Sequence, residues 1–245
     1  MKLTKAMIYS KYGIVYNAKT GTIETPIGEM KELLKVGNSK TGTKVKTGSM
    51  NQTTCPVHCK NCYANFGCYQ FANVKESLRR NTEIAREHLD FLDRALRAQL
   101  ETFKDGTEIR IHAVGDFFNV EYLKMWHDIA RDFPNLIFWT YTKVTAFENA
   151  FEDLSNANIV KSIVKGFGFN FGHVGYVIDM YNALKELNVR VHICRCGIDE
   201  NQHCAGCHKC SECEYVLFVE HSTDYVATED PRYAELVELV ENQEF

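Results

Sequence analysis

Long apolar runs are absent from the sequence. No stretch of about 18 apolar residues, the length needed to span a bilayer, occurs in the 245 residues. The opening MKLTKAMIYSKYG also lacks the continuous apolar stretch of a signal peptide. We therefore expect no membrane partner and a cytoplasmic location. The chain has only four prolines, and its 45% hydrophobic and 24% charged residues are typical of a soluble globular protein.

An excess of positive charge is absent too. The net charge of -4 gives no general attraction for polyanions, which normally shows as a basic face or stripe. Composition therefore gives no support for a nucleic-acid partner, although a local basic groove stays open.

Cysteine, by contrast, is abundant, with ten residues in the chain. The cytoplasm keeps thiols reduced, so metal binding or redox chemistry explains these residues better than disulfides do. Four cysteines fall within residues 55–68 and six within residues 194–213. Cysteines used as small core residues would be scattered. The clustering therefore predicts metal sites.

Strand and helix patterns alternate along the chain. Alternating or β-branched apolar runs predict strands over residues 43–50, 108–114, 136–142, 158–164, 189–194 and 214–220. Apolar residues at helical spacing predict helices over residues 81–104, 119–133 and 177–187. Strands that alternate with helices imply parallel pairing with right-handed crossovers. The pattern predicts an α/β fold with an open sheet or a partial barrel.

Three of the first four cysteines lie within eight residues, in Cys55-Pro-Val-His-Cys59-Lys-Asn-Cys62. One small metal centre can collect all three thiolates. Iron–sulfur clusters normally have four cysteine ligands, so a set of three indicates one iron left open for another ligand. The alternative is a structural zinc site completed by His58 or Cys68.

The spacing of these three cysteines, in a loop after a predicted strand, resembles the shared motif of the radical S-adenosylmethionine (SAM) superfamily. Gly115-Asp116, at the end of the second predicted strand, resembles the glycine-rich turn that contacts the amino group of SAM in that superfamily. The resemblance implies a partial (β/α)6 barrel. It also implies a [4Fe-4S] cluster held by Cys55, Cys59 and Cys62.

The resemblance further implies an activity and its partners. A radical SAM enzyme reductively cleaves SAM at the cluster to form a 5′-deoxyadenosyl radical, which abstracts hydrogen from a substrate. Its electrons would come from a reducing partner such as flavodoxin or ferredoxin. Gly115 and Asp116 are the cofactor contacts that the resemblance implies, and Tyr63 and Thr140 are further expected contacts. Thr140, at the end of the next predicted strand, is alternatively a paired polar residue of the core. The substrate and the oligomeric state are left open.

The combination of CPxxCxxCYA, GDFF and TYTK also looks like a little-characterised phage-encoded branch of this superfamily. No reaction can be transferred from that branch. The rival function, from another class, is a non-catalytic zinc-binding protein with two cysteine-rich knuckles that binds nucleic acid or protein.

The second cysteine group is denser than the first. It comprises Cys194, Cys196, Cys204, Cys207, Cys210 and Cys213, and the last four recur every third residue. This run resembles ferredoxin-type ligation, and radical SAM enzymes often carry an auxiliary cluster toward the C-terminus. Four of the six cysteines would equally supply tetrahedral zinc, with His192, His203 or His208 as substitute ligands. We expect an auxiliary iron–sulfur cluster or zinc here.

Three further features each have a functional and a structural interpretation. Arg110 and His112 either point into a barrel mouth or are paired polar residues of the core. Cys68 is either a hydrogen-atom donor to a substrate radical or a buried structural thiol. The stretch GFGFNFGHVG, residues 166–175, either stacks on a base or packs its phenylalanines into the core.

We divide the chain into three segments. Residues 1–42 form an N-terminal β-hairpin, because β-branched and aromatic residues flank a turn at 17–21. We expect this hairpin to cover the fold or to lie at its edge. Residues 43–193 form the barrel core. Residues 194–245 contain the cysteine-rich second metal site, the last strand and a C-terminal helix.

Overall fold

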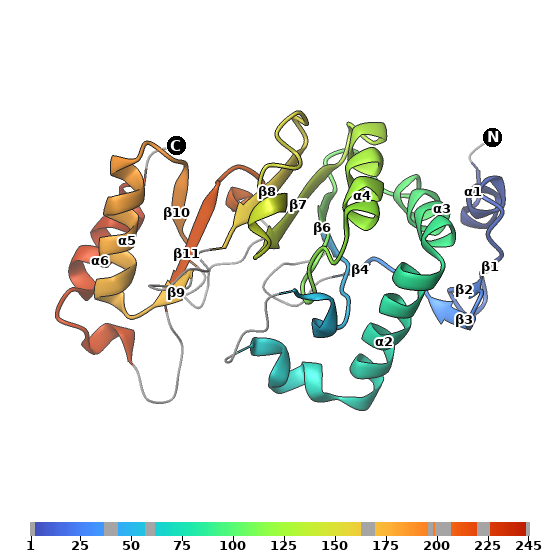
Figure 1. Ribbon diagram of the computed structural model, residues 1–245, viewed down its shortest axis with the longest axis horizontal. Coiled ribbons are helices and arrows are strands. Elements are labelled where there is room, and N and C mark those ends of the chain that lie inside the picture. Colours follow the sequence, from blue (N-terminus) through green and yellow to red (C-terminus); the bar gives the residue numbers. More distant parts are fainter. Residues whose placement is uncertain are drawn as a thin grey trace.

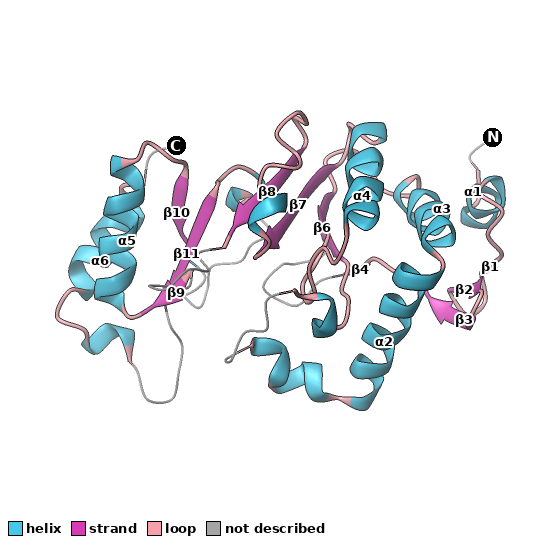
Figure 2. Ribbon diagram, viewed as in Figure 1, coloured by secondary structure: helices cyan, strands magenta, loops and turns pink. Residues whose placement is uncertain are grey.

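The computed structural model describes residues 3–36, 44–56, 62–162, 170–195, 198, 207–219 and 226–243. Within these ranges it has a mixed α/β fold with three sheets (Figures 1 and 2). No helix in this part of the chain has both the length and the apolar character needed to cross a bilayer.

The largest sheet has five strands in the order β4-β5-β6-β7-β8. These strands are β4 Lys35–Val36, β5 Val45–Thr47, β6 Glu108–Arg110, β7 Ile137–Thr142 and β8 Ala157–Lys161. Strands β5 to β8 are parallel and follow one another in the sequence, whereas β4 pairs antiparallel with β5. The carboxyl ends of β5 to β8 therefore lie along one edge, where the loops that follow them meet.

Helices that follow β5 and β6 cover one face of this sheet (Figure 1). They are α2 Ala72–Glu87, α3 Leu89–Leu100 and α4 Val120–Asp132. Their apolar sides and the sheet share one buried core, which includes Ile84, Leu92, Leu96, Ile109, Trp126 and Phe138. Burial of this apolar surface is what holds the helices against the sheet.

The predicted helix over residues 81–104 is two helices that meet at His88. The backbone of His88 leaves the helical region, with φ -138° and ψ 50°. Leu92 N then donates to the His88 carbonyl at 3.0 Å, which starts α3. The apolar spacing continues through this break because both helices pack on the same core.

A second, three-stranded sheet follows in the order β10-β11-β9, and all its pairs are parallel. Its strands are β9 Phe171–Gly172, β10 Val191–Ile193 and β11 Tyr215–Val219, and its core is shared with α5 Val174–Glu186 and α6 Tyr233–Glu241. Lys161 N donates to the Glu214 carbonyl at 2.8 Å, so the end of β8 lies beside the start of β11.

All six predicted strands are therefore present, in two sheets. Strand β11, the last in the sequence, lies between β9 and β10 rather than at an outer edge. A partial (β/α)6 barrel requires one continuous curved sheet. In the part of the chain that the structure describes, these six strands are divided between two sheets, and the barrel stays a prediction.

The N-terminal segment forms a small sheet of its own. The predicted hairpin is present, because β1 Tyr16–Asn17 pairs antiparallel with β2 Thr22–Thr25, and β3 Gly28–Lys31 adds a third strand. The preceding residues form helix α1, Lys5–Lys11, instead of a strand. Thr4 Oγ1 caps this helix by accepting from Met7 N at 3.3 Å.

Candidate metal and cofactor site

Cys55 lies in the loop that follows β5, as the sequence predicts. After β5 the chain runs through a short 3-10 turn, Gln52–Thr54, which ends at Cys55. The Cys55 N–H donates to the Gln52 carbonyl at 3.0 Å, which fixes the backbone there. The first cysteine is therefore carried to the carboxyl edge of the main sheet.

Cys62 begins a second 3-10 turn, Tyr63–Asn65, and the Asn65 N–H donates to its carbonyl at 2.9 Å. The Tyr63 hydroxyl donates to the carbonyl of Ala113, in the segment that follows β6. This contact ties the third cysteine of the motif to the neighbouring strand. Both Cys55 and Cys62 are partly exposed. Cys59 and His58 lie outside the described residues.

Gly115 packs directly against the loop that leads to Cys55. Its φ is +91°, a conformation that L side chains rarely adopt. A β-carbon at this position would lie 2.7 Å from Met50 Cβ and 2.7 Å from Thr54 Oγ1. Thr54 Oγ1 also accepts from the Asp116 N–H at 3.1 Å. Glycine is therefore required for this close approach of the two loops.

The Asp116 carboxylate faces the protein interior and is only 3% exposed. Its Oδ1 accepts from the Phe117 N–H at 2.7 Å and from Thr142 Oγ1 at 2.8 Å. Its Oδ2 accepts from the Lys143 N–H at 2.9 Å. Burial raises the pKa of Asp116 above its usual range, although these donors oppose that shift. Asp116 therefore joins the loops that follow β5, β6 and β7.

Thr140 and His112 lie together on the helix-covered face of the sheet. His112 Nδ1 is 3.2 Å from Thr140 Oγ1, and its Nε2 is 3.0 Å from the hydroxyl of Tyr122 on α4. Burial, with a smaller effect of nearby Arg110, lowers the pKa of His112 to about 3. His112 is thus a paired polar residue of the core, which is its structural interpretation.

Arg110 lies over aromatic side chains of the neighbouring strand. Its guanidinium is 5.3 Å from the ring centre of Trp139 and 5.9 Å from that of Tyr141. Its Nε donates to the His112 carbonyl at 3.0 Å. Arg110 and His112 therefore make different contacts, although both come from the same strand end.

The second cysteine group packs onto the face of the main sheet that carries Tyr141. The Tyr141 hydroxyl is 3.1 Å from Cys210 Sγ. Asn158 Nδ2, on β8, donates to the carbonyls of Cys210 and Cys213 at 2.9 and 2.8 Å. His208 Nδ1 is hydrogen-bonded to the buried carboxylate of Glu108, on β6. Strands β6, β7 and β8 thus all hold this segment.

Four cysteines of the second group fall within the described residues. Cys194 and Cys213 are buried, and Cys207 Sγ is 3.9 Å from His192 Nε2. Burial raises the pKa of Cys210 to about 11 and that of Cys213 to about 12. The remaining predicted ligands, Cys196, Cys204 and His203, lie outside the described residues.

The described residues leave the metal sites incomplete. Among them, no group of three or more histidine, cysteine or acidic side chains is arranged to hold a metal ion. No disulfide joins the seven described cysteines. Cys68 is exposed, in the 3-10 turn Gly67–Gln70, and so is not a buried thiol. Residues 166–169 of the GFGFNFGHVG stretch also lie outside the described part.

Sequence reasoning did not find two residues that hold this region together. Thr54 joins the cysteine loop to Asp116, and Asn158 holds the second cysteine segment. Thr54 directly precedes Cys55, which is a local signal. Asn158 contacts residues more than fifty positions later, and no sequence pattern marks it.

Comparison with known families gives one match. A family model described as "Gene product 88" matches residues 16–216, which is most of the chain. The protein therefore belongs to the gene product 88 family, a family of phage proteins. No curated protein and no solved structure matches the chain.

Proposed function

We propose that this phage protein is a radical SAM enzyme that binds a [4Fe-4S] cluster through Cys55, Cys59 and Cys62. The observation that carries the proposal is the packing of the Gly115 turn against the loop that leads to Cys55. Two loops from adjacent parallel strands thus meet at the carboxyl edge of the sheet, the edge where α/β proteins bind ligands.

The donor set fits such a cluster. Cysteine sulfur is a soft ligand that suits iron–sulfur clusters and zinc, and not the hard cations that oxygen ligands bind. Cys55 and Cys62 are both partly exposed and both lie in backbone turns closed by hydrogen bonds. When bound, a [4Fe-4S] cluster with an open iron supplies the electron for reductive cleavage of SAM.

The residues of the chain have distinct roles in this proposal. Thr54 and Gly115 hold the two loops in contact, and Tyr63 anchors the end of the cysteine motif through Ala113. We assign Asp116 a positioning role, because its carboxylate accepts three hydrogen bonds from the protein. A ligand that reaches this edge meets the partly exposed backbone of Gly115.

We propose that the second cysteine group holds an auxiliary iron–sulfur cluster or zinc. Its support is the attachment of this segment to three strands of the main sheet through Glu108, Tyr141 and Asn158. Such attachment fixes the positions of Cys210 and Cys213 relative to the sheet. Soft thiolate ligands suit either metal group.

The test compares the parent with the Cys55→Ala/Cys59→Ala/Cys62→Ala variant after anaerobic reconstitution with iron and sulfide. We expect close to four irons and the brown colour of a cluster at the first site of the parent. The variant should lose these irons and keep the metal of the second site. Cys68→Ala, which removes an exposed cysteine of the same region, is the matched control and should keep all the iron.

Two outcomes would contradict the proposal. Identical iron content in the triple variant and the parent would mean that these cysteines hold no cluster. A colourless parent that retains zinc after reconstitution would favour the rival function, a zinc-binding protein with two cysteine-rich knuckles.

A further inference from the structure

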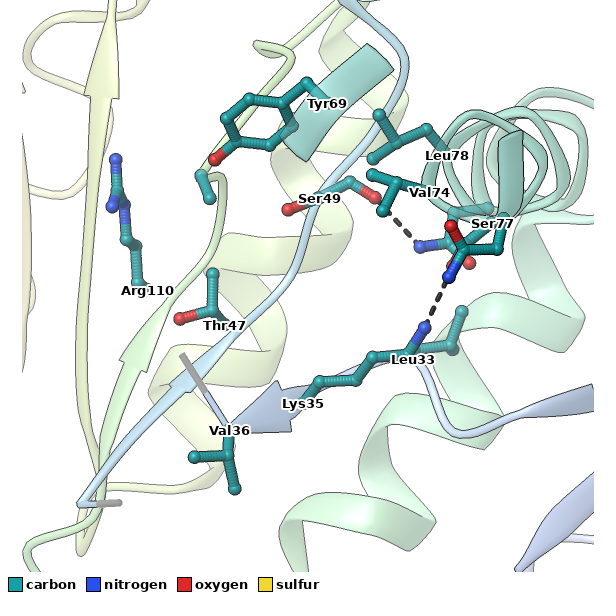
Figure 3. Close-up of a pocket in the computed structure, with 13 residues that line it drawn as sticks. Leu33, Lys35, Val36, Thr47, Ser49, Tyr69, Val74, Ser77, Leu78 and Arg110 are labelled. Carbon is teal, nitrogen blue, oxygen red and sulfur yellow. Dashed lines mark hydrogen bonds between the residues drawn. The ribbon is translucent and has the colours of Figure 1, made fainter. Parts of the chain in front are cut away.

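A pocket with polar and apolar lining residues lies between the edge of the main sheet and α2 (Figure 3). Its volume is about 350 Å³, which is within the range of small-molecule sites. Strands β4, β5 and β6 form one side and α2 forms the other. Its polar lining residues are Lys35, Thr47, Ser49, Tyr69, Asn73, Ser77, Asn81 and Arg110.

The charge of the described lining is entirely positive. Lys35 and Arg110 are its two charged residues, and none of the described residues that line it is acidic. Lys35 Nζ donates to Ser77 Oγ at 2.9 Å across the pocket. Partial desolvation, with a smaller effect of Lys31, lowers the pKa of Lys35. A pocket with two cations and neutral polar groups favours an anion.

Asn81 gives the pocket a hydrogen-bond acceptor. Its Nδ2 donates to the Ser49 carbonyl at 2.9 Å, and this bond fixes which end of the amide is oxygen. The side chain is only 5% exposed, and its Oδ1 has no hydrogen-bond partner among the described residues. Thr47 Oγ1, which is also buried, has none there either. Buried polar atoms usually have a partner, so these two atoms point to a ligand.

We propose that this pocket binds a small organic anion that also carries hydroxyl or amino groups. The anionic group, a phosphate or a carboxylate, lies against Lys35, on the side of the pocket that α2 forms, and Arg110 adds positive charge at the other side. A hydroxyl or amino group of the same molecule donates to Asn81 Oδ1. The apolar side chains of Leu33 and Leu78 close the pocket around its carbon skeleton.

The test measures binding to the full-length protein by titration calorimetry. Ribose 5-phosphate and gluconate serve as the phosphate and carboxylate probes, and ribose is the neutral probe. We expect at least one of the two anions to bind about tenfold more tightly than ribose, because each charged hydrogen bond contributes a factor of this size or more. The result also shows which anionic group the pocket prefers. No metal is needed, so failure of the cluster proposal does not affect this test.

Substitution of Lys35 tests the location. Lys35→Met should weaken binding of the preferred anion about tenfold or more, and Lys35→Arg, which keeps the charge, should retain most of it. Lys75→Met is the matched control, because Lys75 is exposed on the same α2 helix and does not line the pocket. Thermal melting should show that all three variants are folded.

Two results would overturn the inference. One is that neither anion binds more tightly than ribose. The other is that Lys35→Met and Lys75→Met bind the preferred anion equally well, which would place the anion elsewhere on the protein.

Discussion

Gly115 lies so close to the cysteine loop that a β-carbon at its position would come within 2.7 Å of Thr54 Oγ1. The two residues are the contact point of the loops that follow β5 and β6. Any side chain at position 115 has to push these loops apart. The spacing of the cysteine loop from the sheet therefore depends on this one glycine.

We predict that Gly115→Ala lowers the free energy of unfolding by about 3 kcal/mol. The positive φ costs roughly 1–2 kcal/mol and overpacking of the loop costs about the same again. Urea denaturation measures this loss. Gly106→Ala is the matched control, because Gly106 also has a positive φ, +74°, but no atom lies within 4 Å of its added β-carbon. The unfolding free energy of Gly106→Ala should fall only by the cost of the positive φ. Equal losses of unfolding free energy in the two variants would contradict the close contact at Gly115.

Asp116→Asn tests whether the carboxylate positions loops or binds a ligand. The amide has one oxygen instead of two, so a buried donor from Thr142 or Lys143 loses its acceptor. We expect the free energy of unfolding to fall by about 2 kcal/mol without any ligand present. Asp90→Asn, at an exposed position of α3, should change it by less than about 0.5 kcal/mol.

The opposite pattern would contradict the positioning role. If Asp116→Asn is as stable as the parent but no longer binds SAM, the carboxylate contacts the cofactor directly. Equilibrium dialysis with SAM and the denaturation curve together separate these two roles.

His112 should make the protein less stable in mild acid. Burial lowers its folded-state pKa to about 3, whereas the pKa in the unfolded chain is about 6.5. Between these values only the unfolded state binds the proton, so stability is complete above about pH 6.5 and falls as the pH decreases toward 3. At pH 5 the loss from this residue is about 2 kcal/mol.

Two measurements check the behaviour of His112. His112→Gln should reduce the difference in unfolding free energy between pH 7 and pH 5 by about 2 kcal/mol. NMR of the imidazole nitrogens should show neutral His112 in the folded protein at pH 5. A protonated His112 at that pH would contradict its burial between Thr140 and Tyr122.

Asn158→Leu should release the second cysteine segment from the main sheet. The variant loses the two hydrogen bonds to the carbonyls of Cys210 and Cys213, at a cost of about 2 kcal/mol. Hydrogen exchange should become faster in residues 209–213 and stay unchanged in β6. Asn182→Leu, on the exposed side of α5, is the control. Unchanged exchange in 209–213 would mean that other contacts hold the segment.

The local patterns of the sequence predicted the strands and most helices. LIFWTYT became β7, Ile137–Thr142, because its apolar and β-branched residues fit a buried strand. The sequence does not predict the helix that starts at Lys5, because AMIYSK contains aromatic and β-branched residues that also suit a strand. A helix forms here because Thr4 caps its N-terminus and because Tyr9 packs in the core.

Long-range relationships were not predictable in the same way. The position of β11 between β9 and β10 depends on pairing between residues far apart in the chain. The burial of His112 against Tyr122 depends on where α4 packs. The alternation of side chains along a strand predicts only that His112 shares a face with Arg110. Local spacing did predict the cysteine loop after a strand and the Gly115-Asp116 turn after the next one.

The most direct test of the central claim is release of 5′-deoxyadenosine. Reconstituted protein, reduced with dithionite and mixed with SAM, should form 5′-deoxyadenosine and methionine, measured by mass spectrometry. The Cys55→Ala/Cys59→Ala/Cys62→Ala variant should form none, and Cys68→Ala should match the parent. If reduced parent that binds SAM releases no more 5′-deoxyadenosine than the triple variant, even with cell extract as a source of substrate, the proposed activity is wrong.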